Sequence, residues 1–294
     1  MSWPQLSDVG ILAEGLDHPE GVAVGPGGHV HAGGEAGQVY RITPAGQVET
    51  VATTGGFVLG LCLDGDGVVY ACDIGLGAVM RITPDGQVRV HARGPRDQRF
   101  VNPNYPVFDR RGNLFVSDSG AWMRDNGFVA KVTPDGRVSV WSDAVRAFPN
   151  GLALGPGGDG LAVVETTLRR ITWVPILPGG GAGTPRVLAQ LPGAVPDGIA
   201  YDAEGTLYVG CYRPDAIYRV TGGGKVELLL ADPWGTTLAA PTNLAFGGEG
   251  NRRLYIASLG RWHVAYLDMP VPGLAPIRPR LGQARGDTTP SAHD

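Results

Sequence analysis

The sequence predicts an all-β protein: one six-bladed β-propeller with four-stranded antiparallel blades. Two observations support this prediction. A unit of roughly 45 residues recurs six times along the 294-residue chain, and each copy holds several apolar segments of strand length. The 47 glycines and 24 prolines stand between these segments, where they mark turns. A closed all-β domain of this length is within the ordinary range.

The first strand of each unit is apolar and follows a small turn. It is found in PEGVAVG (19–25), VLGLCLD (58–64), PNYPVFD (103–109), PNGLALG (149–155), PDGIAYD (196–202) and PTNLAFG (241–247). A glycine-rich turn and a second strand follow, in HVHAGG (29–34), VVYACD (68–73), NLFVSD (113–118), LAVVET (161–166), TLYVGC (206–211) and RLYIAS (253–258). Such turns between two apolar runs are typical of β-hairpins.

The third strand comes next, and a fourth follows it in most units. Third strands are found in QVYRITPAG (38–46), AVMRITPDG (78–86), FVAKVTPDG (128–136), RRITWVP (169–175), AIYRVTGGG (216–224) and HVAYLDM (263–269). Fourth strands are found in QVETVAT (47–53), QVRVHAR (87–93), RVSVWSD (137–143) and KVELLLA (225–231).

The last unit lacks a fourth strand, because the chain loses its strand pattern after Met269. We expect the first segment, DVGILAEGL (8–16), to supply this outer strand and close the ring. The alternative, an open solenoid, would leave an unprotected edge. The propeller is therefore expected over residues 1–274, and the Pro-, Gly- and Arg-rich residues 275–294 are expected to form a flexible C-terminal tail.

Charge and hydropathy exclude several classes of partner. The net charge is −4, and the lysines and arginines are scattered singly, so no nucleic-acid-binding surface is expected. No segment has the length and hydropathy of a membrane span, and the first residues do not resemble a secretion signal. These patterns predict a cytoplasmic protein with no membrane partner. We expect its partner to be a small-molecule substrate, and the protein to be a monomer or weak homo-oligomer.

One position recurs at the start of every first strand, where a propeller brings side chains to the mouth of its central channel. Its members are Glu20, Leu59, Asn104, Asn150, Asp197 and Thr242, which we call the column. Taken singly, the Asn-Gly, Asp-Gly and Glu-Gly pairs are also ordinary turn sequences. Together, two carboxylates and two amides on one axis favour a hard cation between them. We expect Ca²⁺, with Mg²⁺, Mn²⁺ and Zn²⁺ as alternatives.

The same segments resemble the SMP-30, gluconolactonase and luciferin-regenerating enzyme (regucalcin-like) family of six-bladed propellers. The resemblance rests on PEGVAV (19–24), PNYPVFDRRGNLFVSD (103–118), PNGLAL (149–154), PDGIAYDAEGTLYV (196–209) and PTNLAFGG (241–248). It implies that the metal ligands are Glu20, Asn104, Asn150 and Asp197. It also implies that Asp197 acts as general base while the metal polarises a substrate carbonyl. The expected activity is that of a metal-dependent hydrolase of a small lactone or ester.

The chain departs from the family pattern at two positions near the expected ligand Asn104. Tyr105 follows Asn104 where the family commonly has Asp, and Asn102 stands where many sugar-lactone members have Arg. The missing Arg weakens the case for a sugar-acid lactone. Residues expected to contact the substrate are Asn102, Tyr105, Asp118, Trp122, Glu165 and Tyr212.

Several of these side chains also have a structural interpretation. The loops after the second strands return to the mouth, so they are expected to place Asp73, Asp118, Glu165, Tyr212 and Ser258 around the site. Acidic residues at strand ends commonly cap turns, which is the structural alternative for Asp73, Asp118 and Glu165. His18 and His263 are the two candidates for a proton shuttle. The alternatives to hydrolysis are a metal-dependent cyclisation or isomerisation on the same scaffold, and a propeller without enzymatic activity that binds a partner.

Overall fold

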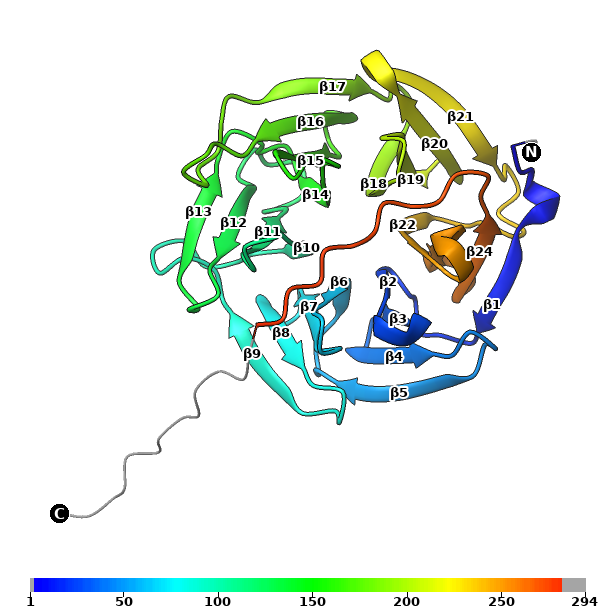
Figure 1. The fold of residues 1–294 in the computed structure, drawn as a ribbon, viewed down its shortest axis with the longest axis horizontal. Helices are drawn as coiled ribbons and strands as arrows, with labels where there is room; N and C mark the ends of the chain where they lie inside the picture. The colour runs from blue at the N-terminus through cyan, green and yellow to red at the C-terminus, as the bar shows by residue number, and fades with distance from the viewer. Residues whose placement is uncertain (1–2, 282–294) are drawn as a thin grey trace.

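The computed structural model describes residues 3–281 as a ring of six four-stranded antiparallel sheets. Figure 1 looks down the axis of this ring, with the sheets arranged as blades around it. The prediction of a six-bladed propeller is confirmed.

The strands of each blade follow one another in chain order from the axis outward, except that β1 is the outermost strand of blade 6. Blade 1 is β2 (Val22–Val24), β3 (Val30–Gly33), β4 (Gln38–Ile42) and β5 (Val48–Thr53); blade 2 is β6 (Val58–Leu63), β7 (Val69–Asp73), β8 (Ala78–Ile82) and β9 (Val88–Ala92); blade 3 is β10 (Pro103–Phe108), β11 (Leu114–Asp118), β12 (Phe128–Val132) and β13 (Val138–Ser142). Blade 4 is β14 (Pro149–Leu154), β15 (Gly160–Glu165), β16 (Arg170–Pro175) and β17 (Arg186–Gln190); blade 5 is β18 (Val195–Tyr201), β19 (Leu207–Arg213), β20 (Ala216–Thr221) and β21 (Lys225–Ala231); blade 6 is β22 (Pro241–Gly247), β23 (Arg253–Ser258), β24 (His263–Asp268) and β1 (Gly10–Glu14). Short 3-10 turns lie at Leu6–Asp8, Pro26–Gly28, Gly222–Gly224, Glu249–Asn251 and Leu259–Arg261.

The ring is closed by the first strand of the chain. β1 pairs antiparallel with β24, so blade 6 combines strands from both ends of the described chain. The predicted closure by residues 8–16 is confirmed. Within the described residues no helix is long and apolar enough to cross a membrane.

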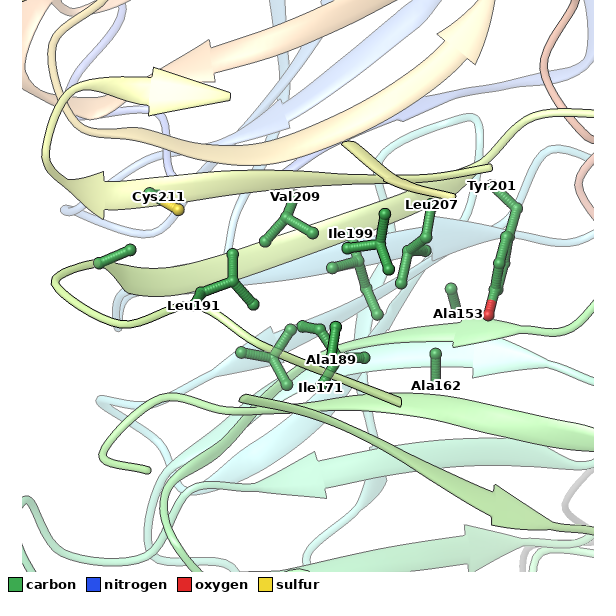
Figure 2. Close-up of a cluster of buried hydrophobic side chains, with 13 residues drawn as sticks. Ala153, Ala162, Ile171, Ala189, Leu191, Ile199, Tyr201, Leu207, Val209 and Cys211 are labelled. Carbon is green, nitrogen blue, oxygen red and sulfur yellow. The ribbon is translucent and has the colours of Figure 1, made fainter. Parts of the chain in front are cut away.

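The hydrophobic core lies between neighbouring blades. Because a blade packs against two neighbours, its middle strands are buried on both faces, and all five residues of β7 and of β11 are buried. The outermost strands are different, since none of the six residues of β5 is buried. Figure 2 shows one interface, in which blade 4 contributes Ala153, Ala162 and Ile171 and blade 5 contributes Ile199, Leu207, Val209 and Cys211.

The chain after β24 does not leave the propeller at once. Residues 270–281, which we call the strap, run across the face that Figure 1 presents. The Leu274 amide donates to the Tyr201 carbonyl at 2.9 Å, the Gly65 amide donates to the Pro279 carbonyl at 2.9 Å, and Arg278 donates to the Val24 carbonyl. These contacts reach blades 5, 2 and 1.

The strap includes the first residues of the expected tail. Residues 275–281 differ from that expectation because Ile277 packs against clusters of blades 2, 3 and 4, and Leu281 packs between blades 2 and 3. Residues 282–294 lie outside the described part of the chain. The strap roofs a cavity of about 170 Å³ on the axis, lined by inner-strand residues that follow the column.

Candidate metal centre

An irregularity in the inner strands lies at the column. In blade 3, Pro103 pairs with Asp118 and the next pair is Pro106 with Val116, so β10 uses three residues where β11 uses two. The inner strands β6, β14, β18 and β22 have a register shift at the equivalent place. A β-bulge of this kind redirects side chains, and bulges are frequent beside active sites. In this protein the bulge lies at the column, at one mouth of the channel.

Glycines after the column residues let neighbouring inner strands approach closely. A Cβ atom on Gly21 would lie 2.2 Å from the Leu59 carbonyl oxygen, and one on Gly198 would lie 2.7 Å from the Thr242 carbonyl oxygen. A side chain there would push two blades apart. The glycines that suggested turns in the sequence therefore also determine how tightly the column side chains converge.

The four predicted ligands are all buried. The exposed fractions of Glu20, Asn104, Asn150 and Asp197 are 6%, 3%, 5% and 7%. The Oδ1 atoms of Asn104, Asn150 and Asp197 have no hydrogen-bond partner in the protein. Buried oxygens without partners are uncommon, and three on one column fit a bound cation.

The two carboxylates influence each other. The pKa of Glu20 is well above its usual value, first because of burial and then because of repulsion from Asp197. Burial raises the pKa of Asp197 to about 7, while the Asn150 amide acts in the opposite direction. Two carboxyl groups in one desolvated site are destabilised when both are charged, and a divalent cation would offset that charge. The donor set therefore fits Ca²⁺ or a similar oxygen-binding ion.

The column members without a ligand role stabilise the ring. Leu59 is buried and apolar, and the Thr242 hydroxyl donates to the Glu20 carbonyl at 2.7 Å. The next residue, Asn243, has no exposed surface; its amide donates to the Glu20 carbonyl at 3.0 Å and to Glu20 Oε2 at 3.2 Å. Asn243 was not predicted from the sequence. Its only signal was that Asn replaces the glycine that follows the column residue in four other blades.

The acidic residues at the ends of second strands serve the loops. The Asp118 carboxylate accepts from the main-chain amides of Val101, Asn102 and Gly120, and Asp118 is fully buried. Glu165 is 1% exposed and accepts from Arg170 and Thr172. The predicted substrate contacts of Asp118 and Glu165 are therefore not supported, because their oxygens are enclosed and already bonded. Asp73 and Ser258 hold neighbouring loops in the same way.

Tyr105 lies elsewhere than expected. Its ring packs against Gly60 of the next inner strand and lines the axial cavity under the strap. It therefore lies beyond the column and away from the mouth, because the residue after the ligand Asn104 turns toward blade 2. The structure does not support the predicted contact of Tyr105 with a substrate entering from the mouth.

Other predicted residues do lie around the mouth. The rim is formed by the residues two positions before the column: His18, Phe57, Asn102, Phe148, Val195 and Ala240. The Trp122 ring makes an edge contact with Phe148, with 4.8 Å between ring centroids, and Tyr212 is 42% exposed at the end of β19. Asn102 is half-buried, and its Oδ1 atom is buried without a protein partner.

The two histidines have different surroundings. His263 is 3% exposed, and its Nε2 lies 2.9 Å from the Thr237 carbonyl, so it is used within the fold and does not reach the mouth. His18 lies on the rim, with Nδ1 at 2.9 Å from Asp17 and 3.0 Å from Glu35. Asp17, His18 and Glu35 also have ligand atoms close enough for a metal. They are partly exposed and already paired with each other, unlike the column oxygens.

The fold and the axial ring of oxygen donors define a six-bladed propeller with a candidate cation site at one mouth. Residues 35–260 match the family described as the SMP-30/gluconolactonase/LRE-like region. The chain belongs to this family.

Two curated relatives match this chain over part of its length. The human adipocyte plasma membrane-associated protein is 29% identical over 255 residues, which cover 73% of this chain and 59% of that protein. The 6-deoxy-6-sulfogluconolactonase of Pseudomonas putida is 30% identical over 140 residues, 46% of each chain. The chain thus spans about half the length of the curated relatives it matches.

Solved structures share the fold at low sequence identity. A gluconolactonase from Xanthomonas campestris superposes with a TM-score of 0.77 at 22% identity, covering 89% of both chains. A calcium-binding regucalcin from Agrobacterium tumefaciens superposes with a TM-score of 0.76 at 18% identity, covering 92% of this chain and 95% of that one.

Proposed function

We propose that the column binds one divalent cation, with Ca²⁺ the best fit, and that the protein hydrolyses a small lactone or ester at this site. The observation that carries the proposal is the set of buried, unpartnered oxygens of Asn104, Asn150 and Asp197 beside Glu20. The names of the relatives, a sulfogluconolactonase and a calcium-binding regucalcin among them, support the same activity and ion. A cytoplasmic location stays a prediction from the sequence.

The column residues would divide the chemistry between them. Glu20, Asn104, Asn150 and Asp197 would hold the cation, which when bound supplies Lewis-acid activation of a carbonyl group. Asp197 accepts a proton from the attacking water, whose oxygen forms the new bond to the carbonyl carbon. The bond from that carbon to the ring oxygen breaks, and the proton passes to the released alkoxide. The products are a carboxylic acid and an alcohol within one molecule.

Substitution of the carboxylates tests this proposal. We expect Asp197→Asn to lower kcat by at least about 100-fold, because an amide cannot accept the proton. Glu20→Gln should weaken Ca²⁺ binding in a calorimetric titration. Chelation of the wild-type protein should lower its unfolding temperature by roughly 5 °C, reversibly on addition of Ca²⁺.

The matched control is Glu49→Gln, which removes an exposed carboxylate that pairs with Arg41 on an outer strand. It should leave Ca²⁺ binding and kcat unchanged. A wild-type protein that contains no divalent ion, and whose unfolding is indifferent to Ca²⁺, would contradict the proposed site.

A further inference from the structure

Exposed large apolar side chains gather at the mouth that holds the column. Of fifteen in the described residues, seven lie on its loops or strand ends: Val101, Trp122, Met123, Leu168, Tyr212, Trp234 and Trp262. Of the other eight, Leu177 lies on a loop of the opposite face, Trp3 lies in the N-terminal segment, and six are on outermost strands. Single exposed apolar residues are common, but seven on this face against one loop residue on the opposite face favour this face as a binding surface. We call Trp122, Tyr212, Trp234 and Trp262 the collar.

Contacts connect the collar to the column. Trp122 touches Phe148, two residues before the ligand Asn150. Trp262 touches His18, two residues before the ligand Glu20, with 4.7 Å between ring centroids. Tyr212 follows Cys211, which pairs with Pro196 beside Asp197. Trp122 and Tyr212 thus lie on blades 3 and 5, each of which supplies a predicted ligand. Trp262 lies on blade 6, next to blade 1 and its predicted ligand Glu20.

The collar rings do not fill gaps between blades. Trp122 is 59% exposed, Trp262 is 51% exposed and Trp234 is 87% exposed. A ring that sealed a blade interface would be largely buried, as Phe115 and Phe128 are at 1% and 2%. The collar surface is therefore available to a ligand that approaches the column.

The rim has few groups that could bind sugar hydroxyls. Of its six residues only His18 and Asn102 have polar side chains, and His18 is already paired with Asp17 and Glu35. At the rim itself, a polyhydroxylated ring would replace its water with few hydrogen bonds, which is unfavourable. The Asn102 Oδ1 atom has no partner in the protein, but it is buried and so does not present an acceptor to the solvent at the mouth.

From this arrangement we infer that the substrate carries an aromatic or hydrocarbon group next to its lactone or ester bond, and that the collar binds this group. The inference rests on the proposed hydrolase function and specifies its substrate class. Trp122 is the specificity-determining residue with the firmest support, because it is exposed and also packs on the rim.

Two lactones with the same ring size test the inference. With the Ca²⁺-loaded protein, kcat/KM should be at least roughly ten-fold higher for δ-decanolactone than for glucono-δ-lactone. Trp122→Ala should lower kcat/KM for δ-decanolactone by roughly ten-fold and leave glucono-δ-lactone unaffected, because only the alkyl chain loses its contact. The control is Trp3→Ala, which removes an exposed ring that stacks on Arg219 and should change neither value.

The possible failures are distinguishable. Faster hydrolysis of glucono-δ-lactone would overturn the inferred substrate class while the hydrolase function stands. A Trp122→Ala variant with unchanged kinetics on both lactones would show that the collar serves another partner, such as a protein or a lipid surface, and would also overturn it. Failure of the loaded enzyme to open either lactone would count against the proposed function itself.

Discussion

Asn243 connects ring closure with the candidate metal site. Its amide group donates to both the main chain and the side chain of Glu20, across 223 residues of sequence. One of these bonds fixes the carboxylate in the direction of the column. Residues that orient a metal ligand in this way commonly change metal affinity strongly when they are replaced.

We expect Asn243→Leu to weaken Ca²⁺ binding by about 10-fold or more, since the variant roughly keeps the size of the side chain but cannot donate to Glu20 Oε2. Terbium luminescence titration measures this affinity directly, separately from stability. Asn243→Gln, which retains the amide, should recover part of it. Equal affinities for the wild type and Asn243→Leu would show that Asn243 only joins blades 6 and 1.

At this scale the sequence pointed to the column as a candidate site but not to all contacts of its residues. The column was visible because it recurs once in every blade, and in several blades it stands beside the same turn glycine, at Asn150-Gly151 and Asp197-Gly198 for example. Asn243 was not predicted, and Tyr105, which was expected at the mouth, lines the axial cavity. Their positions depend on which neighbouring inner strand leaves space, and that is a property of packing between blades that no local pattern encodes.

The strands were predictable element by element, whereas the strap was not. Hairpin turns and apolar runs are local signals, and they repeat in each blade. The strap has no periodicity because it touches several blades through isolated residues such as Ile277 and Leu281. The composition of residues 275–281 alone therefore suggested a flexible tail. Isolated contacts of this kind become visible only once the ring is assembled.

Removal of the strap residues should destabilise the propeller. A chain that ends at Leu274 loses the apolar contacts of Ile277 and Leu281 and the hydrogen bond between Gly65 and Pro279. We expect its free energy of unfolding to fall by about 2 kcal/mol or more. The measurement is urea denaturation, and a chain that ends at Leu281 is the control because it keeps all of these strap contacts. Identical midpoints for the two chains would contradict a stabilising strap.

Acid stability is a property of the whole molecule to which His31 and His91 contribute. Burial, the largest cause, lowers the pKa of each to about 4, and the nearby positive charge of Arg41 adds to the effect on His31. An unfolded histidine titrates near a pKa of about 6.5. Between these two pKa values the unfolded state binds the proton more readily than the folded state. The contribution of the two histidines to the free energy of unfolding is therefore fully present above about pH 6.5 and is lost as the pH falls toward about 4.

We expect His91→Gln to flatten this loss by up to about 1.4 kcal/mol per pH unit in urea unfolding at about pH 6.5, 5.5 and 4.5. The buried column carboxyl groups titrate alike in both proteins, so the difference between the two curves isolates His91. The curves should run parallel above about pH 7. Parallel curves over the acid range as well would mean that His91 binds its proton as readily in the folded protein as in the unfolded chain.

The pairing of β1 with β24 has a consequence for synthesis of the protein. β1 leaves the ribosome before the other strands of the ring, and its partner β24 is completed about 250 residues later, which takes roughly 10 to 50 s at ordinary rates of translation. Throughout that interval the nascent chain has an unpaired first strand, and the last blade cannot form. Blades 1 to 5 can fold while the chain grows, but the annulus becomes continuous only after β24 has emerged and paired with β1. Until then the incomplete arc has unpaired edge strands, which can pair with other chains and promote aggregation.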